Sequence, residues 1–591
     1  MKAIRNLLPL FAPALAVAAA VTMSGCGGGG GGGASGTTTP TPTGSVNVQI
    51  TDGPSDEFQH VWVTINSIAF HTSADQVWSA SDATWQKFAL PAPVTVDLST
   101  LNNGALNSLF SGLSLPTGTY HQIRFFFDGA EASLDASALA TKDSNGAALQ
   151  WNDQVEYLNA HSSYAITEAP LEIAYPTQGI QLQGAFAITA GSTLSLAVDF
   201  DLEHIIVPFN HGGMTYFTMK PNLAYYDMSK VGAITGTINP AQLCQTASAE
   251  ITQSPTCAYN LIIKAERLTA DGTRHFDARA TTVDPVTGKF TLYPLATQDA
   301  SGNAITSYDV LIRGRNTETM IVTGVPVTTA TAPGGTGSAA PTSLQSTAVV
   351  LTLNPAEYTA QFATPLSPLS SGHAIFQQTL PNSTQPYEVR WRNTDPFTGM
   401  FHNPIPLQGA SSMLHVASYN GGNTLAFASV VPVEGQGAFT VADNEVVYYG
   451  LSTGAVMMPP SSGTTQTFVP GAPALVSGVQ SGTINVNLSF SGIANDDSCS
   501  LVVSRFAAII DADTMDCSTL ISTAKSNGGT SSGSFSLTGV PSGVPGAYYY
   551  AYVRVWNSAH PAASKLIVPL TGFIDLRTQP TQTLNGSIPG A

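Results

Sequence analysis

Segments in which apolar and polar residues alternate at every second position recur along the whole chain. This alternation is typical of β-strands with one buried face, and the enrichment in Val, Ile, Phe and Thr favours the same structure. One short helical candidate, residues 97–110, interrupts the pattern. The sequence therefore predicts an all-β protein, and its clearest strands are SVNVQITD (45–52), HVWVTINSIAF (60–70), STLSLAVDFD (192–201) and SGTINVNLSF (481–490).

The chain is too long for one hydrophobic core, and its polarity comes mainly from uncharged residues. At 591 residues it has room for three or four domains. Only 10% of the residues are charged, against roughly 25% in an ordinary soluble domain. The net charge of -17 argues against binding to nucleic acid and against electrostatic adhesion to anionic lipid. This composition is typical of an exported β-rich protein.

The N-terminus combines a basic start, an apolar run and a cysteine. Lys2 and Arg5 precede the apolar residues 7–21, a run shorter than the roughly 20 residues that span a bilayer but suited to a signal peptide. Met23-Ser24-Gly25-Cys26 resembles a bacterial lipobox, which implies lipidation of Cys26 and a place in the cell envelope. Gly27 after the cysteine resembles lipoproteins sorted to the outer membrane. The alternative is an ordinary signal peptide with an incidental cysteine.

A glycine tract follows Cys26 and leads into TTTPTPTG, Thr37 to Gly44. The tract lacks the preceding strand and the following GK[ST] of a phosphate-binding loop. Gly-rich chain is flexible and Pro-containing chain is stiffer. We therefore interpret the segment as a tether.

Five motifs occur in order in the first third of the chain. This order resembles the N-terminal domain of many bacterial surface lipoproteins, the domain of unknown function 4382. The resemblance implies an exported β-sandwich-like domain with no established activity, and it transfers no catalytic residue. The motifs are VQITDGPSDEFQHVWVTINSIAFH (48–71), VDLSTLNNG (96–104), LPTGTYHQIRFFFDG (115–129), GAFAITAGSTLSLAVDFDLEHIIV (184–207) and FTMKPNL (217–223).

A different pattern of strand, Gly-x-Phe turn and closing strand occurs twice further along. The first copy contains GAITGTINP (232–240) and GKFTLYPLA (288–296), and the second contains SGTINVNLSF, GSFSLTGVPSG (533–543) and YYYAYVRVW (548–556). The pattern resembles transthyretin-like modules that accompany carboxypeptidases. It implies serial Ig-like or transthyretin-like β-sandwiches.

These patterns divide the chain into seven segments. We predict a signal peptide (1–25), a lipidated cysteine with its tether (26–44), a domain resembling domain of unknown function 4382 (45–230), a transthyretin-like sandwich (231–325), a linker (326–346), a β-rich domain (347–475) and a second transthyretin-like sandwich (476–591).

The remaining four cysteines form two local pairs. Cys244 lies near Cys257, and Cys499 lies near Cys517. No Cys/His spacing of a zinc site is present. Local pairs in an exported β-rich chain favour two disulfides, each stabilising by roughly 3 kcal/mol. The alternative is four buried free thiols.

Neither H-E-x-x-H nor a Walker loop occurs in the sequence. The richest constellation is acidic: Asp52, Asp97, Asp128, Asp199 and Asp201. On a strand Asp199 and Asp201 would share one face, and a cation such as Ca²⁺ would relieve their repulsion. Turn or cap roles are the principal interpretation of these acidic residues. A cation site is the second interpretation, and a catalytic pair is the third.

Histidines and aromatic residues give no specific motif. The histidines of the first domain are scattered, which favours surface or hydrogen-bonded roles, and they are His60, His71, His121, His161, His204 and His211. Four tryptophans, Trp62, Trp78, Trp85 and Trp151, could form a sugar-binding platform, but core packing is the principal interpretation. Tyr548, Tyr550 and Tyr552 alternate on one strand face as a sheet cover.

Together these features predict a membrane-anchored envelope lipoprotein that acts in binding, adhesion or envelope structure. We predict no catalytic residue, no metal site and no cofactor. The expected partners are the membrane, through the lipid on Cys26, and an envelope protein or a glycan. The alternative is a carbohydrate-binding protein or a metal-assisted carbohydrate-active enzyme.

Overall fold

The computed structural model describes the chain from residue 41 to residue 589 with gaps. The described residues are 41–74, 78–130, 132–159, 165–173, 179–211, 214–219, 223–238, 261–314, 318–329, 342–348, 356–361, 372–395, 400–405, 407–408, 411–421, 424–426, 433–443, 451–452, 455–457, 466–468, 474–475, 480–493, 497–505, 508–511, 518–541, 549–557, 566–570, 574–576 and 578–589.

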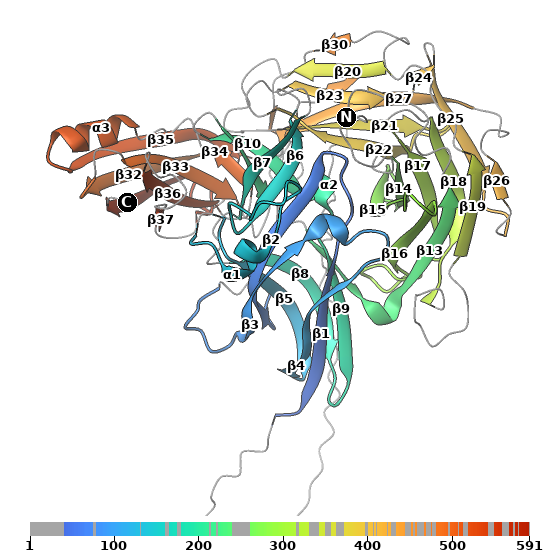
Figure 1. Cartoon of the computed structure of the whole chain (residues 1–591), viewed down its shortest axis with the longest axis horizontal. Coiled ribbons are helices and arrows are strands. Elements are labelled where there is room, and N and C mark those ends of the chain that lie inside the picture. The colour runs from blue at the N-terminus through green and yellow to red at the C-terminus, as the bar shows by residue number, and fades with distance from the viewer. Residues whose placement is uncertain are drawn as a thin grey trace, which may run out of the picture.

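Almost all regular structure in this part of the chain is β, which confirms the predicted fold class (Figure 1). The helices are short: α1 (Ala136–Ala140), α2 (Leu202–Ile205), α3 (Ser518–Ser526) and the 3₁₀ turns η1 (Leu98–Thr100) and η4 (Met228–Lys230). Among the described helices, none has the length and hydropathy needed to cross a membrane.

The N-terminal domain, residues 43–227, consists of two sheets. The smaller has the order β12 (Ala224–Asp227), β9 (Thr193–Asp199), β1 (Thr43–Thr51), β4 (Asn107–Pro116). The larger has the order β10 (Ile206–His211), β11 (Met214–Met219), β7 (Ala165–Glu172), β6 (Gln154–Asn159), β2 (Phe58–His71), β5 (Gly118–Phe127), β8 (Ile180–Ile188), with β3 (Gln86–Asp97) beside β2.

One hydrophobic core joins these two sheets. Val46, Val48 and Ile50 alternate along β1 and are fully buried, because every second residue of a strand faces the same side. They share a core cluster with Phe125 and Phe127 of β5 in the other sheet. The N-terminal domain is therefore a packed pair of sheets.

The helix expected over residues 97–110 does not form. Asp97 caps the single 3₁₀ turn η1 by accepting a hydrogen bond from the backbone N–H of Ser99. Asn103 and Gly104 then adopt positive φ angles of 56° and 80°, which end a right-handed helix. The remaining residues enter β4.

The central sheets, residues 231–475, form the next part of the molecule. One has the order β16 (Lys289–Ala296), β13 (Val231–Ile238), β19 (Thr342–Ala348), β26 (Thr424–Ala426). A ten-stranded sheet has the order β15 (His275–Thr282), β14 (Ile262–Leu268), β17 (Ser307–Arg313), β18 (Thr319–Pro326), β25 (Ser411–Ser418), β27 (Val433–Asp443), β21 (Gly372–Thr379), β22 (Pro386–Asn393), with β24 (Leu407–Gln408) and β29 (Ala455–Met457) attached. Two small sheets contain β23 (Met400–Ile405), β20 (Ala356–Gln361) and β30 (Gln466–Phe468), and β28 (Leu451–Ser452) with β31 (Ala474–Leu475).

The ten-stranded sheet continues across the predicted linker. β18 comes from the segment before 326–346, and it pairs in parallel with β25 from the segment after it. β19 begins inside 326–346 and pairs with β13. The segments 231–325 and 347–475 thus contribute strands to common sheets.

The C-terminal sandwich, residues 481–589, has a core of its own. One sheet has the order β35 (Ser531–Pro541), β32 (Ser481–Ser491), β38 (Thr581–Pro589), and the other has the order β34 (Ala508–Asp511), β33 (Asp497–Arg505), β36 (Tyr549–Asn557), β37 (Leu566–Pro569). The buried Tyr552 hydroxyl lies 3.3 Å from Glu172 Oε2 of the N-terminal domain. Figure 1 shows the C-terminal sandwich and the central sheets on opposite sides of the N-terminal domain.

Each part opens with a strand that has the same neighbours. β1 pairs antiparallel with β4 and parallel with β9. β13 pairs antiparallel with β16 and parallel with β19, and β32 pairs antiparallel with β35 and parallel with β38. The two sequence copies that open at β13 and β32 therefore share their local topology.

Few of the predicted modification residues lie in the described part. Cys499 is buried on β33. Cys26, Cys244, Cys257 and Cys517 lie outside the described residues. The lipid on Cys26 and the two disulfide pairings remain predictions.

Candidate functional site

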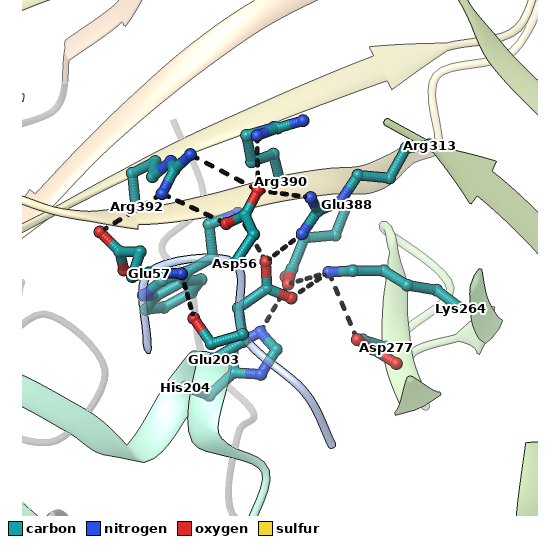
Figure 2. Close-up of polar contacts among 12 residues, drawn as sticks. Asp56, Glu57, Glu203, His204, Lys264, Asp277, Arg313, Glu388, Arg390 and Arg392 are labelled. Atoms are coloured by element: carbon teal, nitrogen blue, oxygen red, sulfur yellow. Dashed lines mark hydrogen bonds and ion pairs between the residues drawn. The ribbon is translucent and has the colours of Figure 1, made fainter. Parts of the chain in front are cut away.

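Charged side chains gather where the N-terminal domain meets the central sheets (Figure 2). Burying charges is costly unless they are paired, so this concentration needs a structural or chemical reason. The chain has only 21 Lys and Arg residues, and four of them lie here. We call the cluster the ionic junction, and its members are Asp56, Glu57, Glu203, His204, Lys264, Asp277, Arg313, Glu388, Arg390 and Arg392.

Asp56 is the centre of one half of the ionic junction. It lies in the turn between β1 and β2, and its side chain is only 3% exposed. Asp56 Oδ2 accepts hydrogen bonds from Arg313 Nη1 at 2.9 Å and from Arg390 Nη1 at 2.7 Å. Arg392 Nη1 lies 3.2 Å from Asp56 Oδ1. One carboxylate of the N-terminal domain thus serves three guanidinium groups of the central sheets.

The strand β22 presents its charges from one face. Glu388, Arg390 and Arg392 are spaced by two residues, and alternate residues of a strand point to the same side. All three are buried. Arg390 Nη2 also donates to the carbonyl of Gly314, at 3.1 Å. The sequence YEVRWRN therefore builds a charged face on a strand that is buried in the assembled molecule.

Lys264 of β14 is the centre of the other half. Its Nζ lies 2.7 Å from Glu203 Oε2, 3.3 Å from Asp277 Oδ2 and 3.7 Å from Glu388 Oε1, and its side chain is 0% exposed. Burial opposes the charge on Lys264, but these carboxylates raise its pKa above the usual value. Burial raises the pKa of Asp277 to about 7, against the influence of Lys264. Lys264 is thus a built-in cation among acids from three segments.

His204 connects two carboxylates. Its Nδ1 lies 2.8 Å from Asp201 Oδ2 and its Nε2 lies 2.6 Å from Glu388 Oε1. Burial alone would lower the pKa of His204, but the two carboxylates raise it well above the usual value. The imidazole is therefore a cation at neutral pH, and both of its nitrogens donate.

Glu203, His204 and Asp277 have ligand atoms within 4.8 Å of one another, a set that could hold a metal ion. Lys264 already lies between Glu203 and Asp277, and both nitrogens of His204 are engaged. A metal ion would compete with an ammonium group for the same oxygens. The arrangement therefore suits ion pairing between domains better than metal binding.

We expect replacement of His204 with Gln (H204Q) to give a pH-dependent loss of stability. Because the pKa of His204 is raised in the folded state, its contribution is complete below the unfolded-state pKa of about 6.5 and is lost as the pH rises through the folded-state pKa. Urea unfolding of both proteins from pH 6 to pH 9 measures it. The difference in unfolding free energy should shrink as the pH rises, and a difference that grows would contradict the assignment.

Arg279 of β15 forms a second contact with the N-terminal domain. Its Nη1 lies 2.5 Å from Asp199 Oδ1, and its Nη2 donates to Thr51 Oγ1 at 2.6 Å. Its Nε donates to the carbonyl of Tyr293 at 3.1 Å, within the central sheets. Burial raises the pKa of Asp199 and Arg279 opposes that rise. Asp199 thus belongs to a buried pair between domains.

The acidic constellation expected from the sequence separates into different roles. Asp97 caps η1 and lies 2.6 Å from His60 Nδ1. Asp128 accepts a hydrogen bond from Asn66 at 2.7 Å, and the buried Asp52 accepts from the backbone N–H of Leu202 at 3.1 Å. Asp199 pairs with Arg279, and Asp201 pairs with His204. The five side chains therefore do not form one catalytic or cation site.

The tryptophans do not form an open platform in the described part. Trp62 and Trp85 are each 3% exposed. Trp62 stacks on His60, and the half-buried Trp78 packs against Trp85 and Phe126. Trp151 is half-buried. These positions favour core packing over the sugar-binding alternative.

The other histidines and tyrosines have separate surroundings. His71 is buried and lies 3.0 Å from Thr84 Oγ1, and His121 is half-buried. Tyr552 of β36 contacts the N-terminal domain. His161 and Tyr548 lie outside the described residues, and the same holds for the side chains of His211 and Tyr550.

Sequence reasoning missed the cations of both contacts. Each lies inside a strand, although charged residues are rarely fully buried. In a chain with so few charges, a charged residue within an apolar strand such as LIIKAERL was the available signal. The missed residues are Lys264, Arg279, Arg313, Arg390 and Arg392.

The chain is weakly similar to several solved structures. It covers 68% of the Bacillus anthracis TIE protein with 90% of its own length, at 8% identity and a TM-score of 0.14. It covers 98% of a streptococcal ancillary pilin with 60% of its own length, at 10% identity and a TM-score of 0.12. It covers 56% of the pilus adhesin SpaC of Lactobacillus rhamnosus GG with 90% of its own length, at 10% identity and a TM-score of 0.13. Nothing about function follows from likeness at this level.

No curated protein matches the sequence. A family model does match part of it, and the match covers the first motifs and nearly all of the N-terminal domain. Residues 43–221 match the family described as domain of unknown function (DUF4382).

Proposed function

We propose that this protein is a lipid-anchored envelope protein whose β-domains form a non-catalytic, rigid head for binding, adhesion or envelope structure. The observation that carries the proposal is the set of ion pairs formed by the residues that the sequence offers for catalysis or cation binding. Asp199 forms a buried ion pair with Arg279 of the central sheets, and His204 pairs with Glu388 of the central sheets and with Asp201 of its own domain. Residues that could have served catalysis hold domains together.

Buried contacts between the domains support the rigid-head part of the proposal. The ionic junction and the Arg279 contact both fix the N-terminal domain to the central sheets, and Tyr552 joins the C-terminal sandwich to it. Their groups are nearly dry, so they resist screening by salt better than surface pairs. Such a head, carried on the predicted tether, would present a fixed surface to an envelope protein or a glycan. Turnover of a glycan or peptide by the purified chain would contradict the non-catalytic part of the proposal.

The anchor part of the proposal rests on the Met23-Ser24-Gly25-Cys26 motif. We expect Cys26→Ser to abolish partitioning of the protein into the detergent phase, because the serine hydroxyl cannot form the thioether to diacylglycerol. Ser24→Ala keeps a small residue before the cysteine and should partition like the wild type. Phase separation of membranes from a bacterial host, followed by mass spectrometry of the N-terminal peptide, measures both. Unchanged partitioning of Cys26→Ser would overturn the anchor.

A further inference from the structure

Three carboxylates converge in the N-terminal domain, away from the ionic junction. Glu156 of β6 and Glu168 of β7 are directly opposite in the antiparallel register, and Asp143 follows α1. One ligand atom from each lies within 4.8 Å of the other two. Like charges directly opposite on neighbouring strands are destabilising. The arrangement needs a compensating group.

Glu156 is the carboxylate for which a compensating group matters most, because it is buried. Glu156 is 0% exposed, and its Oε1 accepts a hydrogen bond from the backbone N–H of Ser144 at 2.9 Å. Oε2 is buried and has no hydrogen-bond partner among the described residues. An unsatisfied buried carboxylate oxygen is costly. A bound cation would satisfy it.

The other two carboxylates are oriented by neighbouring groups. Asp143 Oδ1 accepts from the backbone N–H groups of Asn145 and Ala147 at 2.9 and 2.7 Å. Glu168 Oε2 accepts from Gln150 Nε2 at 2.5 Å. Burial raises the pKa of Glu168, and the adjacent Asp143 raises it further. The three acids are therefore fixed in position and electrostatically crowded.

A second turn of the same form shows that the carboxylate cluster is not required by the turn. Asp299 Oδ1 accepts from the backbone N–H groups of Ser301 and Asn303, and Gly302 has φ of 83° where Gly146 has 80°. Each turn is closed by an isolated bridge, Lys142 to Ala148 and Gln298 to Ala304. The Asp299 turn forms its hydrogen bonds at the exposed surface. Glu156 and Glu168 are additions that the turn itself does not need.

We propose that Asp143, Glu156 and Glu168 bind one Ca²⁺ ion. The donors are all hard oxygen atoms, and Ca²⁺ takes six to eight such ligands in flexible geometry. Glu168 is partly exposed, so water can complete the shell. Mg²⁺ demands a tighter octahedron and gives up its water reluctantly, and Zn²⁺ favours nitrogen and sulfur donors. The site would fasten the loop after α1 to strands β6 and β7.

Calorimetric titration of the chelator-treated full chain with CaCl₂ tests the site. We expect a dissociation constant of about 10⁻⁵ to 10⁻³ M, in the range of sensor and extracellular Ca²⁺ sites, and a higher Tm in CaCl₂ than in EDTA. MgCl₂ should bind more weakly. Glu156→Gln should weaken Ca²⁺ binding by at least about tenfold, because it removes one of three charged ligands. In EDTA the same variant should unfold no earlier than the wild type, because it relieves repulsion.

The turn at Asp299 supplies the matched control. Asp299→Asn changes the same kind of turn without the facing glutamates, and it should leave Ca²⁺ binding unchanged. Glu168→Gln, at a partly exposed position, repeats the test if Glu156→Gln does not fold. Absence of a heat signal and of a Tm change in the wild type would overturn the proposal. Wild-type affinity in the folded Glu156→Gln or Glu168→Gln variant would overturn it equally.

Discussion

Replacing Asp56 with Asn (D56N) is expected to lower the free energy of unfolding by about 3–5 kcal/mol, the cost of removing one partner from a buried ion pair. The substitution leaves Arg313, Arg390 and Arg392 without their shared anion, in a region where their side chains are at most 8% exposed. All three belong to the central sheets. We therefore expect the N-terminal domain to unfold separately, which calorimetry would record as two resolved transitions.

The control for D56N is an ion pair at the surface. Lys230 Nζ lies 3.3 Å from Asp227 Oδ2, and the two side chains are 56% and 23% exposed. Asp227→Asn removes this charge and keeps the cap of η4, because Asn caps a helix about as well as Asp. Its effect should stay below about 1 kcal/mol. Equal effects of the two substitutions would show that the ionic junction does not hold the domains together.

The strands could be predicted because a buried face imposes alternation on the sequence. Val46, Val48 and Ile50 show this at β1. The 3₁₀ turn at Leu98–Thr100 could not be distinguished from the start of a helix by the same means. Its end depends on positive φ angles at Asn103 and Gly104, which periodicity does not report. Local sequence patterns thus predict the strands, whereas residues with positive φ angles determine where this helical turn ends.

The ionic junction depends on partners far apart in the chain. Asp56 and Arg390 are 334 positions apart and share a hydrogen bond. A single sequence shows that Arg390 is a charge within a strand, but it does not show which carboxylate faces it. The sequence pattern also could not show that Asp199 and Asp201 pair with separate cations. The sequence shows which residues are charged. Which residues pair with one another follows only from how the domains pack.

The pair of Arg279 and Asp199 predicts a specific thermodynamic coupling. Arg279→Leu (R279L) leaves Asp199 buried and unpaired, and Asp199→Asn (D199N) does the same to the guanidinium, so each should lower the free energy of unfolding by about 3–5 kcal/mol. The side chains are 1% and 6% exposed, so solvent gives little compensation. The double variant removes both charges and should lose less than the sum.

Chemical denaturation of the wild type, R279L, D199N and the double variant measures this coupling. For residues in one ion pair the deviation from additivity is typically about 0.5–3 kcal/mol. R279L combined with Asp299→Asn at the exposed turn should be additive within about 0.5 kcal/mol, as expected for sites without shared partners. Additivity of R279L and D199N would mean that Arg279 does not hold the N-terminal domain through Asp199. A coupling of this size would instead show that this buried pair helps to hold the N-terminal domain to the central sheets.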